Sequence, residues 1–334
     1  MEPSGSNRLR KRVQGYNLLM RKGLLLYNPA AGRVPVRPFV RGIVRPLTSA
    51  GWQIEVAETL SGRHATLVAH QAALENFDAV FAIGGDGTVG QVASGLMNSE
   101  TALAVLPAGT MNVWAAEVGI PVFDWLHNQA LQKNAHLLAN SKIYRVDVGV
   151  CNHQVFLLWA GIGGLDAIAV NQMEPRPRFA KYLSVPQYAA ATVWNAAIWH
   201  GMDLRVWADD QRLDGHFLLA VATNIRRYIG GIAVLSPNAY LDDGEMDMWL
   251  FSGDNVAVAL RHFVDLFAGR HLTSDQAQCL PFHSVRVESD TPFSMHLDGE
   301  PLLGGSTAEI RIQKQALRVI VPSKALKLLK EQRA

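Results

Sequence analysis

The glycine-rich stretch GGDGT, residues 84–88, places one carboxylate and one hydroxyl within a flexible backbone. An apolar run typical of a buried strand precedes it, and the residues after it show helical spacing of apolar side chains at Val89, Val92, Ala93 and Leu96. A turn that leads from a strand into a helix N-terminus presents unpaired N–H groups, which favour an anion such as phosphate. A turn without a ligand needs fewer glycines, so we interpret this stretch as a phosphate cradle.

The same stretch also matches the dinucleotide-binding fingerprint GxGxxG, from Gly85 to Gly90. However, its strand is not the first of the chain, and no acidic residue ends the next strand to bind a ribose. Asp86 would moreover repel a bare pyrophosphate. A magnesium–nucleotide complex removes this repulsion, because Mg²⁺ bridges carboxylates and phosphates. The GxxxxGK[ST] sequence of a P-loop does not occur.

Two further strand candidates end in similar turns, NPAAG at 28–32 and LPAGTMN at 106–112. In an open parallel sheet the carboxyl ends of the strands line one crevice, where ligands bind. Thr110 and Asn112 can either cap the short helix that follows or offer a hydroxyl and an amide to a phosphate or ribose. We therefore expect the three turns to form one nucleotide site.

Two acidic clusters lie in the second half of the chain. Asp298 and Glu300 flank a glycine directly after an apolar strand, a pattern equally typical of a hairpin turn and of a pair of catalytic carboxylates. The segment NAYLDDGEMD, residues 238–247, is either a solvated acidic turn or a set of hard oxygen ligands. The residue types alone leave both alternatives open.

The elements that position these groups change character near Lys142. Before it, apolar strands alternate with helices, which predicts a parallel sheet covered on both faces. After it, alternating strands and turns predict an antiparallel sandwich or barrel, with hairpins at 203–224 and 307–322 and helices at 185–200 and 255–269. We predict an α/β domain over 15–141 and an all-β domain over 142–321, with a short basic helix at 322–334 packing back on the first.

The composition excludes several classes of protein. A net charge of +2 gives no field that favours nucleic acid, and two cysteines without CxxC spacing indicate neither a disulfide framework nor a zinc site. The chain has no signal-peptide pattern and no uncharged apolar run of membrane-spanning length. The basic residues at 8–12 are interpreted as a solvated terminus or a weak contact with anionic lipid. We expect a cytoplasmic protein that touches the inner membrane surface peripherally, and a homodimer is left open.

Six motifs, in order and spacing, resemble the diacylglycerol kinase catalytic-domain family: NPAAG, GGDGT, LPAGTMN, AGIGGLDA, SPNAYLDDGEMD and LDGEPL. This family includes bacterial lipid kinases and the sphingosine and ceramide kinases. The similarity covers residues 15–322. It implies an N-terminal α/β domain of the phosphofructokinase and NAD-kinase type, a C-terminal antiparallel β-sandwich, and ATP bound between the two.

The resemblance also assigns roles to residues. It implies that Glu300 is the general base, assisted by Asp298, and two neighbouring carboxylates raise the pKa of one of them. Asp86 would lie beside magnesium-bound ATP. Asp243, with the backbone carbonyls of Tyr240 and Glu245, would hold a divalent cation, Mg²⁺ or Ca²⁺. ATP would be bound by the positions that match the nucleotide motifs: Asn28, Thr59, Gly84, Gly85, Asp86, Gly87, Thr88, Thr110 and Asn112.

The chain departs from the family pattern at two positions. Gly90 stands where the family usually has asparagine, and Ala31 stands where serine is common. Both departures remove a polar group from the nucleotide site, while the acidic residues of the chemistry remain. The aromatic residues Trp159, Tyr188, Trp194 and Trp199 either line an acyl pocket or belong to the core, and the loop 174–182 either contacts lipid headgroups or has no ligand.

The expected function is ATP- and Mg²⁺-dependent phosphorylation of a hydroxyl on a diacylglycerol-like or sphingoid lipid, as in phospholipid biosynthesis. One alternative is a kinase of a soluble substrate, such as an NAD kinase. The other is a non-catalytic sensor of nucleotide or lipid, which the missing amide at Gly90 favours slightly.

Overall fold

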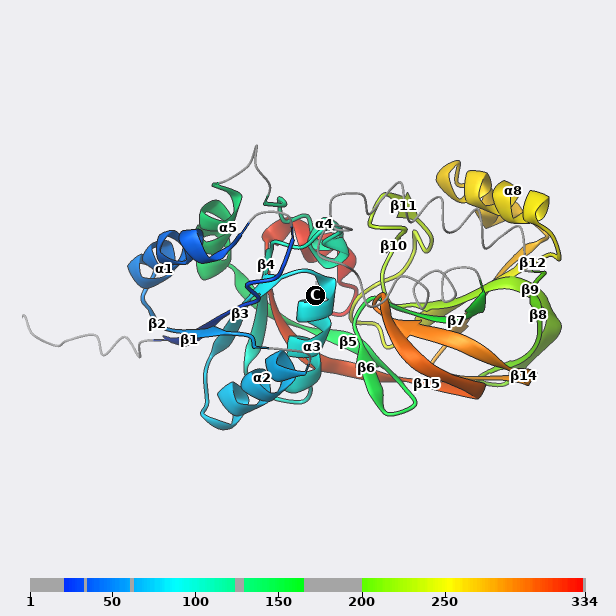
Figure 1. Ribbon diagram of the computed structural model, residues 1–334, viewed down its shortest axis with the longest axis horizontal. Coiled ribbons are helices and arrows are strands. Elements are labelled where there is room, and N and C mark those ends of the chain that lie inside the picture. Colours follow the sequence, from blue (N-terminus) through cyan, green and yellow to red (C-terminus); the bar gives the residue numbers. More distant parts are fainter. Residues whose placement is uncertain (1–20, 33–34, 61–62, 124–128, 165–199, 333–334) are drawn as a thin grey trace, which may run out of the picture.

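The computed structural model describes residues 21–32, 35–60, 63–123, 129–164 and 200–332. An α/β region is followed along the chain by a strand-rich region, and the two lie side by side (Figure 1). Among the described residues, no helix is long and apolar enough to cross a membrane. The expectations for the basic terminus at 8–12 and for the segment 174–199, with its aromatic side chains, lie outside the described residues.

Four parallel strands form the sheet of the first region, in the order β2-β1-β3-β4. Every residue of β3 and β4 is buried, because helices α1 and α5 pack on one face of the sheet and α2 and α3 on the other (Figure 1). The strands are β1 (Arg21–Tyr27), β2 (Trp52–Glu58), β3 (Ala79–Gly84) and β4 (Ala102–Pro107). The helices are η1 (Arg37–Phe39), α1 (Val40–Ser49), α2 (His64–Leu74), α3 (Asp86–Leu96), α4 (Val113–Val118) and α5 (Ala130–Ala139).

Antiparallel strands form the second region, in the order β13-β12-β9-β7-β14-β15, with β8 bridging β14 and β9, and β5 pairing with β15 and β6. Part of its buried apolar side chains form a cluster of their own, while others, such as Val221, Trp249 and Phe251, belong to the same cluster as the core of the first region. Its strands are β5 (Lys142–Cys151), β6 (Gln154–Phe156), β7 (Trp159–Gly164), β8 (Met202–Ala208), β9 (Gln211–Thr223), β12 (Met246–Ser252), β13 (Ala277–Phe282), β14 (Ser284–Leu297) and β15 (Glu300–Val321). The hairpin β10 (Arg227–Tyr228) and β11 (Ala233–Val234), helix α8 (Val256–Phe267) and η3 (Arg270–Thr273) lie outside the main sheet.

The hairpin predicted at 307–322 is wrong, because this segment belongs to one long strand, β15. The polar interruption in its sequence is a bulge, where the register with β5 shifts between Gln313 and Leu317 and Gln315 has φ = 51°. Beyond the bulge, β15 pairs in parallel with β4 and so joins the two regions in one continuous sheet. The tail then forms η4 (Ser323–Leu328), whose Ala325 and Leu328 are buried in the core of the first region.

Candidate active site

The turns that follow β1, β3 and β4 meet at one edge of the parallel sheet. A side-chain carbon on Gly109 would overlap the Cα of Gly85, and one on Gly32 would overlap the carbonyl oxygen of Ala108. The Asn28 N–H donates to the carbonyl of Ile83 (3.0 Å), which ties the first turn to β3. The main chains of the three turns therefore lie directly against one another and form one edge rich in backbone polar groups.

Asn28 and Thr88, both expected at the nucleotide site, are in direct contact. The Asn28 Nδ2 donates to Thr88 Oγ1 (3.2 Å), while the Asn28 Oδ1 accepts the N–H of Ala30 (2.9 Å). The position of Gly84 has no room for a side chain, since a Cβ there would lie 2.5 Å from the Cβ of Thr88. The amide of Asn28 thus fixes both its own turn and the first turn of α3.

Asn112 shapes the third turn with its side chain. It is buried, has φ = 56°, and its amide bonds the backbone of Gly109 twice, accepting the N–H (2.7 Å) and donating to the carbonyl (2.8 Å). Asn112 also occupies the N-cap position of α4 without capping it through its side chain. Thr110 is half-buried beside it, and Thr59 is buried at the end of β2, where its N–H donates to the carbonyl of Tyr27 (2.9 Å).

Asp86 is the residue that caps α4. Its carboxylate accepts the backbone N–H groups of Val113 (3.0 Å) and Trp114 (3.2 Å) in the first turn of that helix. Burial raises the pKa of Asp86, and the hydrogen bonds from backbone N–H groups oppose this rise. The sequence predicted that Asp86 lies beside a magnesium-bound nucleotide. In the structure, the same carboxylate links the start of α3 to the start of α4.

Asp298 fixes the turn between β14 and β15. It has φ = 52°, and its carboxylate accepts the backbone N–H groups of Leu157 (2.8 Å), Leu158 (2.8 Å) and Trp159 (3.1 Å). Burial is the main cause that raises the pKa of Asp298 to about 6, and the negative charge of Asp86 adds to the rise. The dependence on Asp86 shows that the acidic groups of the two regions lie close enough to interact.

The DGE turn, residues 298–300, packs against the first turn of α3. A side-chain carbon on Gly87 would overlap the Oε1 atom of Glu300, and one on Gly90 would lie 3.1 Å from the Oδ2 atom of Asp298. Glu300 is exposed, so its carboxylate lies at the surface of the site. Gly90 therefore leaves room for the carboxylate of Asp298, which gives a spatial reason for the absence of a side chain at this position.

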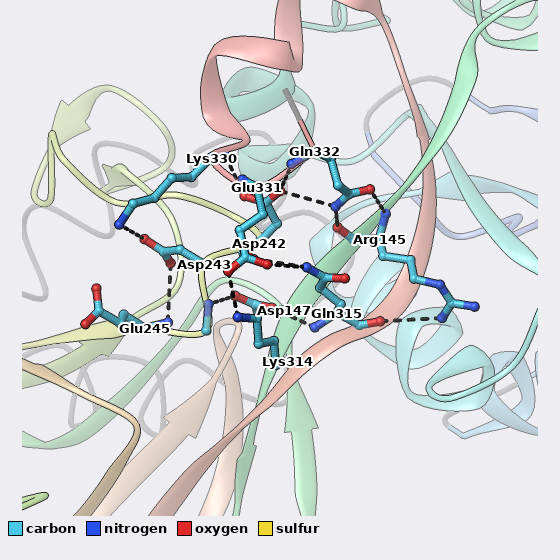
Figure 2. Close-up of polar contacts among 11 residues, drawn as sticks. Arg145, Asp147, Asp242, Asp243, Glu245, Lys314, Gln315, Lys330, Glu331 and Gln332 are labelled. Atoms are coloured by element: carbon cyan, nitrogen blue, oxygen red, sulfur yellow. Dashed lines mark hydrogen bonds and ion pairs between the residues drawn. The ribbon is translucent and has the colours of Figure 1, made fainter. Parts of the chain in front are cut away.

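The expected metal ligands lie on the loop between β11 and β12, where Asp243 and Glu245 are neighbours of the C-terminal tail (Figure 2). The Asp243 Oδ2 atom lies 3.4 Å from the Nζ of Lys330, and its Oδ1 accepts the N–H of Glu245 (3.3 Å). The ring of Tyr240 is 5.6 Å from the same ammonium. Within the described parts of the chain, no group of three or more His, Cys, Asp or Glu side chains is arranged to hold a metal ion.

The sequence did not single out Asp147, which organises this loop. It is fully buried and accepts the N–H groups of Gly244 (2.7 Å) and Gln315 (2.7 Å), so it joins the loop to the bulge of β15. Burial raises the pKa of Asp147 to about 6, and the charges of Asp242 and Asp243 raise it further. Its signal in the sequence is a lone acidic residue between valines in an otherwise apolar strand.

Glu117 on α4 is a second residue that the sequence did not single out. It is buried, and its carboxylate accepts the N–H groups of Arg226 (3.4 Å) and Arg227 (3.1 Å) from the second region. The start of α4 is held by Asp86 and its end by Glu117, so this short helix connects the phosphate turn to the strand-rich region. A glutamate in a helix carries no sequence signal for this role.

Comparisons with known proteins agree with this architecture. Residues 22–151 match the model of the diacylglycerol kinase catalytic domain, and residues 160–321 match that of the YegS C-terminal NAD kinase beta sandwich-like domain. The diacylglycerol kinase of Bacillus subtilis (strain 168) is 26% identical over 283 residues, which cover 84% of this chain and 90% of that protein. The diacylglycerol kinase of Staphylococcus aureus (strain MRSA252) is 25% identical over 293 residues, covering 84% and 87%.

A solved structure shows the same fold. The crystal structure of a diacylglycerol kinase from Bacillus anthracis str. Sterne superposes with a TM-score of 0.70 at 23% identity and covers 91% of this chain and 98% of that one. The two domain models match consecutive parts of the chain, and the matched residues include both the glycine cradle and the DGE turn. On this evidence the chain belongs to the diacylglycerol kinase catalytic-domain family, a family of kinases.

Proposed function

We propose that this protein is an ATP- and Mg²⁺-dependent kinase that phosphorylates a hydroxyl of a diacylglycerol-like or sphingoid lipid. The observation that carries the proposal is the contact between the DGE turn and α3, which puts the Glu300 carboxylate against Gly87 in the phosphate cradle. A base and a phosphate site so close together suit transfer of a phosphoryl group to a hydroxyl. The names of the relatives in Bacillus and Staphylococcus support a lipid as the acceptor.

In this mechanism the backbone N–H groups at the start of α3 bind the phosphates of ATP, and Asn28 and Thr88 hold that turn in place. Glu300 would accept the proton of the acceptor hydroxyl as the hydroxyl oxygen bonds to the γ-phosphorus, while the bond from the γ-phosphorus to the β–γ bridging oxygen breaks and ADP leaves. Asp298 positions the turn that carries Glu300, and Asp86 positions α4. The charge of Asp86 raises the pKa of Asp298, a repulsion that a divalent cation bound with ATP would relieve. That Mg²⁺ would offset negative charge on the phosphates.

Two alternative functions have specific support. The second family model describes an NAD kinase-like sandwich, which favours a soluble acceptor, and Gly90 removes an amide from the site, which favours a non-catalytic sensor. A panel of acceptors with radiolabelled ATP and Mg²⁺ separates them. The proposal predicts labelled diacylglycerol or sphingosine and no labelled NAD. Labelled NAD alone would favour the first alternative, and ATP binding without any labelled product would favour the second.

The pKa of Asp298 predicts the acid side of the pH–rate profile. The ionised carboxylate accepts the N–H bonds that fix the turn bearing Glu300, and protonation removes part of that capacity. We expect the rate at saturating ATP to fall as the pH drops through about 6. Asp86→Asn removes a charge that raises this pKa, so it should move the fall to lower pH. Identical profiles for wild type and Asp86→Asn would contradict the assignment.

Helix α8 supports contact with a membrane, because two of its polar residues face inward while large apolar residues are exposed. His262 and Asp265 are buried, where His262 bonds the carbonyl of Ser252 (2.8 Å) and Asp265 pairs with Arg270 (2.7 Å). Leu266 is buried with them, whereas four other apolar residues face solvent and are between 43% and 53% exposed: Leu260, Phe263, Val264 and Phe267. In a helix that covers a core, the large apolar residues face inward and the charged residues face solvent, and these residues of α8 have the opposite orientation.

Neighbouring side chains extend this apolar face. Ile232, Val234 and Leu272 are also exposed. They lie on or next to β11 and η3, which both contact α8; Figure 1 labels α8 and β11. These three residues and the four exposed apolar residues of α8 are called the α8 patch. The guanidinium groups of Arg261 and Arg270 lie beside it, with side chains 60% and 63% exposed. An apolar face with basic neighbours suits the surface of an anionic bilayer, where the proposed acceptor resides.

Replacing Phe263 and Phe267 together by glutamine is expected to weaken binding to vesicles of phosphatidylglycerol and phosphatidylcholine by about tenfold or more, because two aromatic side chains no longer insert. Phosphorylation of substrate dispersed in detergent should be unchanged. Co-sedimentation measures the first quantity and a kinase assay the second. The matched control replaces Leu67 and Leu74 on α2, which are exposed at 68% and 64%. Equal vesicle binding by both double variants would rule out the α8 patch as the contact.

A further inference from the structure

The C-terminal tail is bonded to the loop that the family resemblance assigns to a divalent cation. The carboxylate of Asp242 accepts three consecutive backbone N–H groups of the tail, those of Lys330 (2.6 Å), Glu331 (3.2 Å) and Gln332 (3.1 Å) (Figure 2). The side chain of Gln332 also bonds the backbone of Arg145, accepting its N–H (3.0 Å) and donating to its carbonyl (2.6 Å). The tail is thus fixed at its backbone and at a side chain.

These bonds determine where the side chain of Lys330 lies. Its ammonium points at the carboxylate of Asp243 (Figure 2), 3.4 Å from the Oδ2 atom. The same ammonium is 5.6 Å from the ring of Tyr240. The Asp243 side chain is only 9% exposed, whereas that of Lys330 is 56% exposed, so the lysine reaches in from solvent to an enclosed carboxylate. A buried carboxylate needs a positive or hydrogen-bonding partner, and here the tail brings one.

The donor set does not fit a divalent cation while the tail is in this position. Mg²⁺ requires near-octahedral oxygen ligands and a carboxylate that faces it. The only side-chain carboxylate of the expected set is that of Asp243, whose Oδ2 faces the Lys330 ammonium and whose Oδ1 accepts the N–H of Glu245 (3.3 Å). The neighbouring carboxylates of Asp147 and Asp242 are directed at backbone N–H groups.

We infer that the ammonium of Lys330 takes the place of the divalent cation at Asp243, so that the protein's own tail neutralises and fixes this loop. The loop then needs no metal, and a divalent cation enters the protein only with the nucleotide. This inference does not depend on the identity of the substrate, because it concerns the loop and the tail alone.

Binding of Mn²⁺ in the absence of nucleotide, followed by electron paramagnetic resonance, tests the inference directly. Wild type is expected to show no saturable site that depends on Asp243. Lys330→Met should gain one such site, and the double variant Lys330→Met with Asp243→Asn should lose it again. Lys327→Met, which removes an exposed lysine from the same tail, is the matched control and should behave as wild type.

Thermal unfolding of the same proteins supplies a second readout and confirms that each variant is folded. The midpoint of wild type should be the same in EDTA and in Mg²⁺, whereas that of Lys330→Met should be lower in EDTA and rise with Mg²⁺ through binding to the folded state. Mn²⁺ binding by wild type that disappears in Asp243→Asn would overturn the inference. So would the absence of any gained site in folded Lys330→Met.

Discussion

Replacing Glu300 by glutamine is expected to lower kcat by about 10² to 10⁴, the usual contribution of a general base, while ATP affinity stays nearly unchanged. The amide keeps the size of the side chain and its place against Gly87 but cannot accept the hydroxyl proton. We therefore expect Glu300→Gln to bind ATP nearly as wild type does but to turn over much more slowly. Isothermal titration with a non-hydrolysable nucleotide and a radiolabel assay with lipid acceptor measure the two quantities.

Glu309→Gln is the matched control for this experiment. Glu309 lies on the same strand, β15, is exposed, and pairs with Arg286 at the surface (3.1 Å) away from the cradle. Its replacement removes two exposed ion pairs, with Arg286 and Arg311, which contribute little to stability, and should leave kcat unchanged. Turnover by Glu300→Gln equal to that of Glu309→Gln would mean that another group accepts the proton.

Gly109→Ala is expected to disrupt the nucleotide site through the backbone. The added methyl group would overlap the Cα of Gly85 and lie 3.0 Å from both the N atom of Gly85 and the Oδ1 of Asn112. Main-chain atoms cannot rotate away as a flexible side chain can, so the turns after β3 and β4 must separate. We expect a loss of about 1–3 kcal/mol in the free energy of unfolding. We also expect a fall of about 100-fold in kcat/KM for ATP, because misplaced phosphate donors no longer match the substrate.

The control for this substitution is Gly42→Ala in the first turn of α1. A Cβ there has no neighbour within 4 Å, and alanine is favoured over glycine in a helix by about 0.5–1 kcal/mol. Urea unfolding should therefore show a gain in stability for Gly42→Ala and a loss for Gly109→Ala. A Gly109→Ala variant that bound ATP as wild type does would show that the two turns tolerate separation.

Local patterns in the sequence predicted much of this fold. The apolar runs of β3 and β4, the glycine turns after them and the helical spacing that begins at Val89 depend on neighbours a few residues apart. The change to alternating strands near Lys142 was equally visible. The hairpin at 307–322 was wrong because a polar interruption looks the same in a turn and in a bulge. Asp147, far away in the sequence, accepts the N–H of Gln315 and so helps to hold the bulge.

The polar contacts of the site could not be predicted in the same way, because they join distant segments. From the sequence we expected Thr110 or Asn112 either to cap α4 or to bind the ligand. In the structure, the side chain of Asn112 bonds the backbone of Gly109, and the carboxylate of Asp86 caps α4. The contact of the DGE turn with α3 depends on how β14 and β15 meet the first region. Neither spacing nor composition encodes such distances, and the family resemblance supplied the roles without the geometry.

We propose above all that Glu300 on the DGE turn accepts the proton of a lipid hydroxyl while the γ-phosphoryl group of ATP in the cradle is transferred to that hydroxyl. The most direct test of this claim is incubation of the protein with γ-labelled ATP, Mg²⁺ and a total lipid extract, followed by phase separation. We predict that wild type labels a lipid in the organic phase and that Glu300→Gln labels none. Label confined to the aqueous phase, or no labelled product from a protein that binds ATP, would contradict the claim.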